Sequence, residues 1–139
     1  MNYLLDTCVI SELTKPEPSP ALREWIAMIH PSSLFLSVVT IGEIRKGIVK
    51  LPGSKKKEHL TLWLDTLIAD YDDRILPVDL AISERWGFLQ GEAEKVGTPM
   101  PTLDGLIAAT ASVYNLTIIT RNEQDFLSSR ILIVNPWKL

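Results

Sequence analysis

Four carboxylates of this 139-residue sequence occur near the ends of short apolar segments. They are Asp6, Glu43, Asp104 and Asp125. Carboxylates that meet at one point can hold a hard divalent cation, whereas carboxylates scattered over a surface only cap helices or face water. The first question is therefore whether the chain brings these four side chains together.

Three of the four acids have ordinary local explanations when each is taken alone. Asp6 follows the first apolar run and is placed to cap a helix. Glu43 falls in the first turn or so of a helical pattern, off its apolar stripe, where the helix dipole favours negative charge. Asn122 is placed to cap the segment after Thr120, with Asp125 three residues later as its partner in a capping-box arrangement.

Asp104 is harder to explain locally. The segment Leu103–Tyr114 is apolar or small on nearly every face, which predicts a helix buried against a sheet. Asp104 is the only charge in that segment. Because burial of an unpaired carboxylate is costly, Asp104 requires either a metal ion or an opening to water.

Taken together, the four acids predict a metal site. Negative charges that share a pocket repel and raise each other's pKa, and a hard divalent cation relieves that repulsion. Oxygen ligands without histidine or cysteine favour magnesium, with manganese as a substitute, over zinc. Such a site suits phosphodiester hydrolysis with one or two ions, with an unengaged carboxylate accepting the proton of the attacking water. The histidines, His30 and His59, are interpreted as helix-end or surface residues, and Cys8 as a small core residue.

The surrounding pattern supplies the elements that would position these acids. Short apolar runs rich in β-branched residues predict strands over 2–5, 34–38, 74–78, 117–120 and 131–134. Helical spacing predicts helices over 41–51, with its stripe at Ile41, Ile44, Ile48 and Leu51, and over 60–69, 81–96 and 103–114. Alternating strands and helices indicate an α/β fold with a parallel sheet, in which ligands bind beyond the carboxyl ends of the strands.

Length and composition limit the class of protein. The chain is long enough for one domain, expected over residues 1–139, and its composition of 46% hydrophobic and 22% charged residues is that of a folded globular protein. A single cysteine excludes an internal disulfide framework. The sequence shows neither a signal peptide nor an apolar stretch long enough to span a membrane, so we expect a cytoplasmic protein.

The net charge of −3 hides a local excess of positive charge. Six of the 14 basic residues, and no acid, lie between residues 45 and 57: Arg45, Lys46, Lys50, Lys55, Lys56 and Lys57. Such a run is usually a solvated helix face or loop. The alternative hypothesis is that part of it, beginning with Arg45 and Lys46, lines a groove for phosphates next to Glu43.

The segments that carry the four acids resemble those of one known family. LLDTCVISEL, SVVTIGEIRKGI, PTLDGLIAATA and TIITRNEQDF, followed by VNPW, resemble in order and spacing a PIN-domain ribonuclease of the VapC toxin type. The resemblance spans essentially the whole chain. It implies a three-layer α/β/α fold around a central, mainly parallel sheet of four to five strands. It also implies a magnesium-dependent endoribonuclease.

The resemblance assigns roles to individual residues. Asp6 and Asp104 match the acids that most directly hold the metal, Glu43 the helix acid that completes the site, and Asp125 a more variable fourth. Thr120 matches a hydroxyl that orders a metal-bound water. Cys8 is a departure, because relatives usually carry asparagine there, and a thiol forms weaker hydrogen bonds than an amide.

The resemblance also implies partners: an RNA substrate, a second copy of the chain in a homodimer, and a cognate antitoxin protein whose C-terminal segment occupies the groove. Three alternatives remain open. A phosphoreceiver domain would normally carry an adjacent acidic pair after the first strand, where this chain has Asp6-Thr7. A catalytically silent PIN-fold interaction module would not need every acid, and a structure-specific DNA nuclease would need additional DNA-gripping segments. No glycine-rich nucleotide-binding motif follows any strand.

Overall fold

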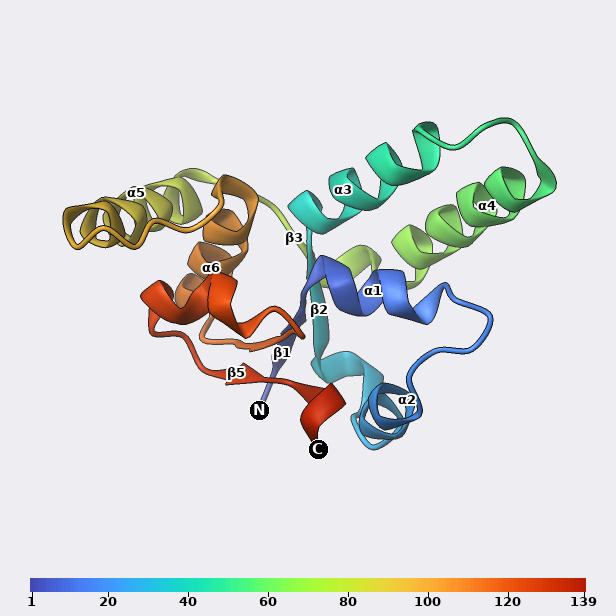
Figure 1. Cartoon of the computed structure of the whole chain (residues 1–139), viewed down its shortest axis with the longest axis horizontal. Coiled ribbons are helices and arrows are strands. Elements are labelled where there is room, and N and C mark those ends of the chain that lie inside the picture. The colour runs from blue at the N-terminus through green and yellow to red at the C-terminus, as the bar shows by residue number, and fades with distance from the viewer.

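The computed structural model describes all 139 residues and contains one five-stranded parallel sheet (Figure 1). Its strand order is β3-β2-β1-β4-β5, and every neighbouring pair is parallel. All five expected strands form, each trimmed by one or more residues. They are β1 (Tyr3–Leu5), β2 (Leu34–Ser37), β3 (Ile75–Leu76), β4 (Thr117–Ile119) and β5 (Ile133–Val134).

Six α-helices and four short 3₁₀ helices connect the strands. The four expected helices correspond to α3 (Val38–Val49), α4 (Lys55–Asp70), α5 (Leu80–Lys95) and α6 (Thr102–Tyr114). The sequence did not predict α1 (Thr7–Leu13) or α2 (Pro20–Ala27). The 3₁₀ helices are η1 (Pro31–Ser33), η2 (Asp72–Arg74), η3 (Glu123–Ser129) and η4 (Pro136–Lys138). No helix combines the length and apolar character that crossing a bilayer requires.

The two faces of the sheet are covered by different helices, which gives three layers. Side chains alternate between faces along a strand, so Leu5 and Ile119 pack in one core while Leu4 and Ile118 pack in the other. Side chains of α1 to α4 fill the first core, and those of α6 and η3 fill the second, with α5 packed alongside α6. The expected three-layer α/β/α fold is therefore confirmed.

The strand order places a topological switch point between β1 and β4. The chain builds outward from β1 through β2 to β3, then returns to the other side of β1 for β4 and β5. Because the two halves diverge there, the loops beyond β1 and β4 leave a crevice between them. Asp6 directly follows β1 and Thr120 directly follows β4, so both residues lie at this crevice.

Candidate active site

Asp6 is held at the switch point by three hydrogen bonds. Its Oδ1 accepts from the Thr7 backbone N–H at 2.8 Å, and its Oδ2 accepts from the Thr120 hydroxyl at 2.7 Å and from the Cys8 thiol at 3.5 Å. The side chain is only 3% exposed. Burial raises the pKa of Asp6 above its ordinary value, although these bonds favour the carboxylate. Asp6 thus caps α1, as its local explanation predicted, and also presents a fixed carboxylate to the crevice.

Thr7 connects Asp6 to Glu43. The Thr7 hydroxyl lies 2.7 Å from Glu43 Oε1, to which it donates, and 3.2 Å from the Thr40 hydroxyl. Since α3 begins at Val38, Glu43 lies beyond the first turn in which the sequence placed it. The sequence prediction did not include Thr7 or Thr40 among the site residues, although the Asp6-Thr7 pair was the available signal.

Asp104 lies in the first turn of α6, half-buried, with no hydrogen bond or ion pair to its side chain. Burial, and then the negative charges of Asp6, Asp125 and Glu43, raise the pKa of Asp104 to about 7. The four acids therefore lie within electrostatic reach of one another. Five of the residues that follow Asp104 in α6 are fully buried (Ile107, Ala108, Ala109, Thr110 and Ala111), as the sequence predicted.

Asp125 lies in η3, but the expected capping box does not form. The Asn122 side chain makes no capping hydrogen bond, and the helix that follows it is a 3₁₀ helix. Instead, the Thr120 hydroxyl accepts a bond from the Asn122 backbone N–H at 2.9 Å. Asp125 is linked to Asn122 only through the backbone, at 3.1 Å, which leaves its carboxylate free. The capping explanation of Asp125 was wrong because the Thr120 side chain, one of the site's own groups, closes this turn.

Helix α5 fixes the start of α6 on both sides of Asp104. The buried Gln90 amide donates to the Met100 carbonyl at 2.8 Å and accepts from the Met100 N–H at 3.0 Å. Four residues earlier, the Trp86 indole packs on Gly105, where an added Cβ would lie 2.9 Å from Trp86 Nε1. That Nε1 is buried and has no hydrogen-bond partner. Sequence patterns gave no sign of either contact.

Cys8 contacts both the acidic site and the core, whereas the sequence was interpreted as placing it in the core alone. Its Sγ is 3.4 Å from the Thr120 hydroxyl, while its side chain also packs against the first core. Burial, followed by the charge of Asp6, raises the pKa of the thiol, so it stays protonated at neutral pH. A protonated thiol is a poor nucleophile, and Cys8 supports the site only through weak hydrogen bonds. His30 caps η1 and His59 is exposed on α4, as expected.

The donor chemistry of the four acids fits a hard cation. No salt bridge of the molecule involves any of the four carboxylates. All their donors are oxygens, and their charges act on one another at Asp104. No three metal-binding side chains are gathered closely enough to hold an ion between them. The site thus offers the charge and ligand type for magnesium, but not a preassembled cage.

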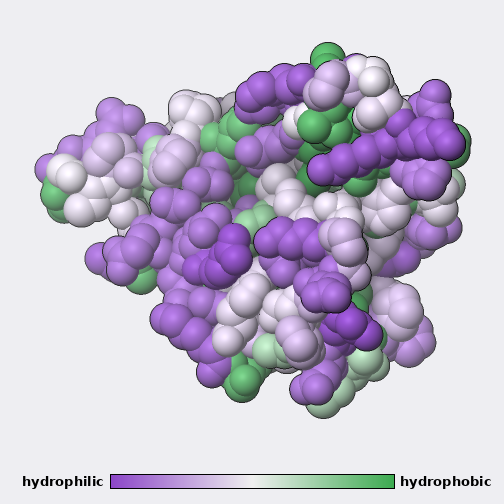
Figure 2. All heavy atoms as spheres, turned by 45° about the vertical axis from the view of Figure 1, so that its right-hand side comes forward, coloured by the Kyte–Doolittle hydropathy of each residue, from purple (hydrophilic) through white to green (hydrophobic).

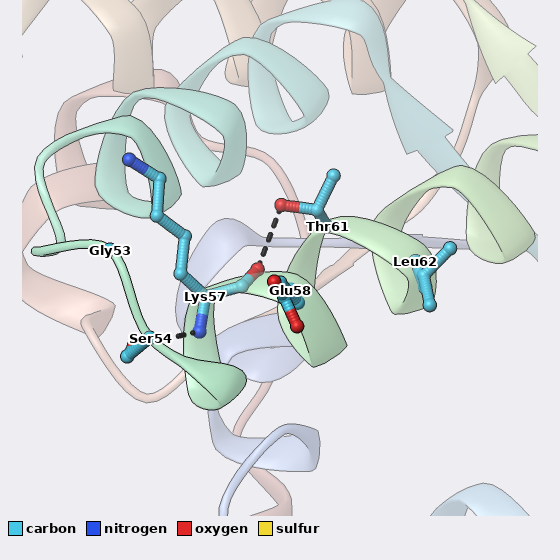
Figure 3. Close-up of a pocket in the computed structure, with 6 residues that line it drawn as sticks. All are labelled: Gly53, Ser54, Lys57, Glu58, Thr61 and Leu62. Atoms are coloured by element: carbon cyan, nitrogen blue, oxygen red, sulfur yellow. Dashed lines mark hydrogen bonds between the residues drawn. The ribbon is translucent and has the colours of Figure 1, made fainter.

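Two of the six basic residues near Glu43 bind other groups of the protein, and four do not. Arg45 Nη2 binds Asp65 Oδ1 of α4 at 2.7 Å, and Lys57 Nζ donates to the carbonyls of Val49 and Leu51. Figure 3 shows Lys57 on the first turn of α4, beside a hollow of about 500 Å³ whose lining contains none of the four acids. Arg45 and Lys57 therefore brace α3 against α4, which weakens the hypothesis that this basic run as a whole receives phosphates. The other four side chains have no partner: Lys46, Lys50, Lys55 and Lys56.

A groove of about 240 Å³ extends from Glu43 between α3 and α4. Five of its ten lining residues are apolar, including Ile48 and Trp63, and Lys56 and two residues in or directly after α1 also line it. Figure 2 shows hydrophobic atoms lying between long hydrophilic side chains over this α3–α4 arm. One end of the groove is thus acidic, and its length is apolar.

Comparison with known proteins gives one family. The sequence model of the PIN domain family matches residues 3–129 of this chain. The chain is 35% identical over 136 residues to "VapC ribonuclease Y4jK" of Sinorhizobium fredii, covering 97% of each protein. It is 33% identical over 135 residues to "Toxin FitB" of Neisseria gonorrhoeae, covering 96% of this chain and 97% of the relative.

Solved structures agree with that result. The crystal structure of FitAcB from Neisseria gonorrhoeae matches with a TM-score of 0.93 and 33% identity, over 99% of both chains. DNA-bound VapBC from Salmonella typhimurium matches with a TM-score of 0.80 and 25% identity, over 98% of both chains. Similarity thus extends over the entire fold, including the elements that carry Asp6, Glu43, Asp104 and Asp125.

Proposed function

This chain belongs to the PIN-domain family, and from that premise we propose that it is a VapC-type toxin, an endoribonuclease restrained by an antitoxin protein. The observation that carries the proposal is the set of four carboxylates at the switch point of the sheet, none of which has a salt-bridge partner. Burial, followed by repulsion from the other three acids, brings the pKa of Asp104 to about 7. Relatives named as a ribonuclease and as a toxin support the same activity.

The proposed cofactor is magnesium, with manganese as a substitute, held by Asp6, Glu43, Asp104 and Asp125. A bound divalent cation would lower the pKa of a water molecule and neutralise charge on the phosphoryl oxygens. With its pKa raised to about 7, Asp104 would lose its proton more readily once a cation was bound beside it. Such a site catalyses hydrolysis of an RNA phosphodiester bond.

The protein's own residues orient the reacting groups. Asp6 cannot rotate freely, because Thr120 and the Thr7 backbone occupy both of its oxygens. Glu43 is aimed by the Thr7 hydroxyl, so its second oxygen, Oε2, is free to face the crevice. A carboxylate that remains outside the ligand set is placed to accept the proton of the attacking water.

The proposed partners are an antitoxin and a second copy of this chain. The groove between α3 and α4 suits an apolar peptide segment, and its Glu43 end suits a basic side chain that would block the acidic site. An antitoxin segment seated there would both cover apolar surface and occupy the catalytic carboxylates. The homodimer is proposed on the resemblance to VapC-type toxins.

The decisive experiment is cleavage of a structured RNA pool by antitoxin-free protein with magnesium, with manganese and with EDTA. Asp104→Asn keeps the shape of the side chain and removes its charge. Asp72→Asn, at an exposed acid of η2, is the matched control. We expect cleavage that requires the metal, is lost in Asp104→Asn, and is retained in Asp72→Asn.

Three other results would contradict the proposal in different ways. Folded protein that binds manganese but cleaves no RNA would favour a catalytically silent interaction module. Protein that neither cleaves RNA nor binds metal would reduce the four acids to caps and solvent-exposed charges. Cleavage of DNA in place of RNA would assign the site to the DNA nucleases.

A further inference from the structure

A second hollow borders the acidic site on the side of η3. It measures about 580 Å³ and lies between the residues that follow β4 and the C-terminal η4. Asp125 belongs to its lining, so the hollow opens directly beside one of the four acids. It is separate from the α3–α4 groove, whose lining shares no residue with it.

One wall of this hollow is a cation stacked on an aromatic ring. The Arg121 guanidinium carbon lies 5.1 Å from the centroid of the Trp137 ring. Trp137 is partly buried and packs against the first core, whereas Arg121 is exposed and forms no salt bridge. The ring attracts the guanidinium, and Arg121 remains exposed to solvent beside the hollow.

The remaining polar groups of the hollow are of two kinds. Glu123 forms a salt bridge with Lys138 at 2.6 Å and accepts a hydrogen bond from the Asn135 amide at 2.9 Å. Asn122 and Gln124 are exposed, and their side-chain amides make no hydrogen bond. Free amides can pair with the edge of a base, since each offers donors and an acceptor.

We propose that this hollow is a nucleotide subsite, in which a base of the RNA next to the scissile phosphate stacks on Arg121. Unpaired bases in single-stranded RNA are commonly bound on arginine planes and aromatic rings. Asn122 and Gln124 contact the edge of that base. The inference rests on the proposed ribonuclease function and adds the position at which the substrate is gripped. A flat cationic face with free amides matches a planar base better than it matches a peptide side chain.

The test measures binding without cleavage. Full-length Asp104→Asn protein, in EDTA, is titrated into fluorescein-labelled single-stranded RNA, and anisotropy gives the dissociation constant. Arg121→Lys is introduced into this background because lysine keeps the charge but loses the plane. Arg85→Lys is the matched control, since Arg85 stacks on Phe88 at 5.5 Å on α5 and lies outside the hollow.

We expect Arg121→Lys to weaken RNA binding about tenfold with an unchanged salt dependence, because one base stack is lost and no charge is lost. Trp137→Leu, which removes the supporting ring, is expected to weaken binding in the same direction. Arg85→Lys is expected to bind like the parent. An RNA with an abasic residue at the stacked position should bind the parent and Arg121→Lys with equal affinity.

Equal RNA affinity of the parent and Arg121→Lys would overturn the subsite, as would equal losses in Arg121→Lys and Arg85→Lys. The same holds if Arg121→Lys weakens binding of the antitoxin but not of RNA. The subsite also fails if the parent binds no RNA. Failure of the nuclease proposal gives a different signature: wild-type protein would bind RNA through Arg121 and yet cleave nothing in magnesium.

Discussion

Asp104 carries the largest electrostatic strain of the site, because a carboxylate is held half-buried among three others. Its pKa of about 7 lies above the ordinary value of 3.8, so the folded state binds the proton more tightly than the unfolded chain. Stability is therefore lost as pH rises from about 4 to about 7, and the full penalty applies above that range. Metal-free protein should be most sensitive to this single residue at alkaline pH.

Asp104→Asn should accordingly stabilise the metal-free protein at about pH 8 and leave it unchanged at about pH 4. After allowance for partial solvent exposure, we expect a gain of about 1–2 kcal/mol in the free energy of unfolding. Urea denaturation at both pH values, with Asp72→Asn as control, measures it. Added magnesium should stabilise the wild type more than the variant. An equal gain at both pH values would refute the electrostatic explanation.

Thr7→Val tests whether the Thr7 hydroxyl orients Glu43 for catalysis without being needed for folding. Valine has nearly the shape of threonine but lacks the hydroxyl that lies 2.7 Å from Glu43. We expect cleavage to fall by about tenfold, the usual scale for misplacing a catalytic group, with little change in melting temperature. Thr61→Val is the control, because the Thr61 hydroxyl binds only the carbonyl of Lys57 on its own helix. Equal cleavage rates in the two variants would show that Thr7 does not aim Glu43.

At this scale the sequence predicted the four acids and Thr120, but not Thr7, Gln90 and Trp86, which orient these acids or the helix that carries them. Asp6 and Asp104 stood out because a strand end and an apolar helix made a charge costly there. Thr7, Gln90 and Trp86 were missed because their roles depend on residues 36, 10 and 19 positions away, which no local pattern encodes. The capping prediction for Asn122 failed because the competing hydroxyl, Thr120, belongs to the site itself.

At the scale of elements, the contact of α5 with α6 determines where Asp104 stands. Trp86 and Gln90 are four residues apart and therefore lie on the same face of α5. Together they hold Met100 and Gly105, the residues on either side of Asp104. A shift of α6 by even a fraction of an ångström would move the carboxylate relative to Asp6.

Gly105→Ala tests this contact. Its Cβ would stand 2.9 Å from Trp86 Nε1 and 3.0 Å from Trp86 Cδ1. We expect a loss of about 1–3 kcal/mol in stability and a fall in cleavage, both partly reversed by Trp86→Phe, which makes room. Gly91→Ala is the control. Gly91 lies on α5, the helix that carries Trp86, and no atom lies within 4 Å of the position of its Cβ, so the substitution should leave stability unchanged or raise it slightly. Thermal unfolding of Gly105→Ala, of Trp86→Phe and of the variant that combines them measures the coupling between the two residues.

All five strands and the four longest helices could be predicted from the sequence, because the strands are short apolar runs rich in β-branched residues and the helices are long enough for helical spacing to stand out. The helices α1 and α2 could not. They are 7 and 8 residues long, too short for a helical repeat to stand out, and Asp6 and Ser19 cap them at points that resembled strand ends and loops. Boundaries were late for α3 because its first turn, at Val38 and Val39, is β-branched and resembles a continuing strand.

For the whole molecule, the distribution of exposed apolar side chains bears on assembly. Phe88, Val96 and Leu127 border a hollow of about 360 Å³ between α5 and η3, and each is at least 60% exposed. Burial of such side chains against a second copy would remove apolar surface from water. The sequence could not reveal this surface, because its members come from two separate elements.

We therefore expect the homodimer to use this surface. Phe88→Glu should raise the dimer dissociation constant by at least about tenfold, because a buried unpaired charge is costly in an interface. Sedimentation equilibrium over a range of concentrations measures the change. Leu62→Glu, an equally exposed apolar residue on α4, is the control and should not dissociate the dimer. A monomeric wild type, or dissociation only in the control, would disprove the assignment.

The bond between Thr120 and Asp6 joins residues 114 positions apart. During translation, β1 and Asp6 emerge early, but Thr120 follows β4 and is synthesised late. The chain forms β2 and β3 on one side of β1 before it reaches β4 on the other side, so the Asp6 carboxylate lacks this hydrogen bond until then. A nascent or truncated chain that stops before β4 therefore carries Asp6 and Glu43 without Thr120 and Asp125. Under the proposed function, ribonuclease activity is therefore acquired only after β4 and η3 have been synthesised.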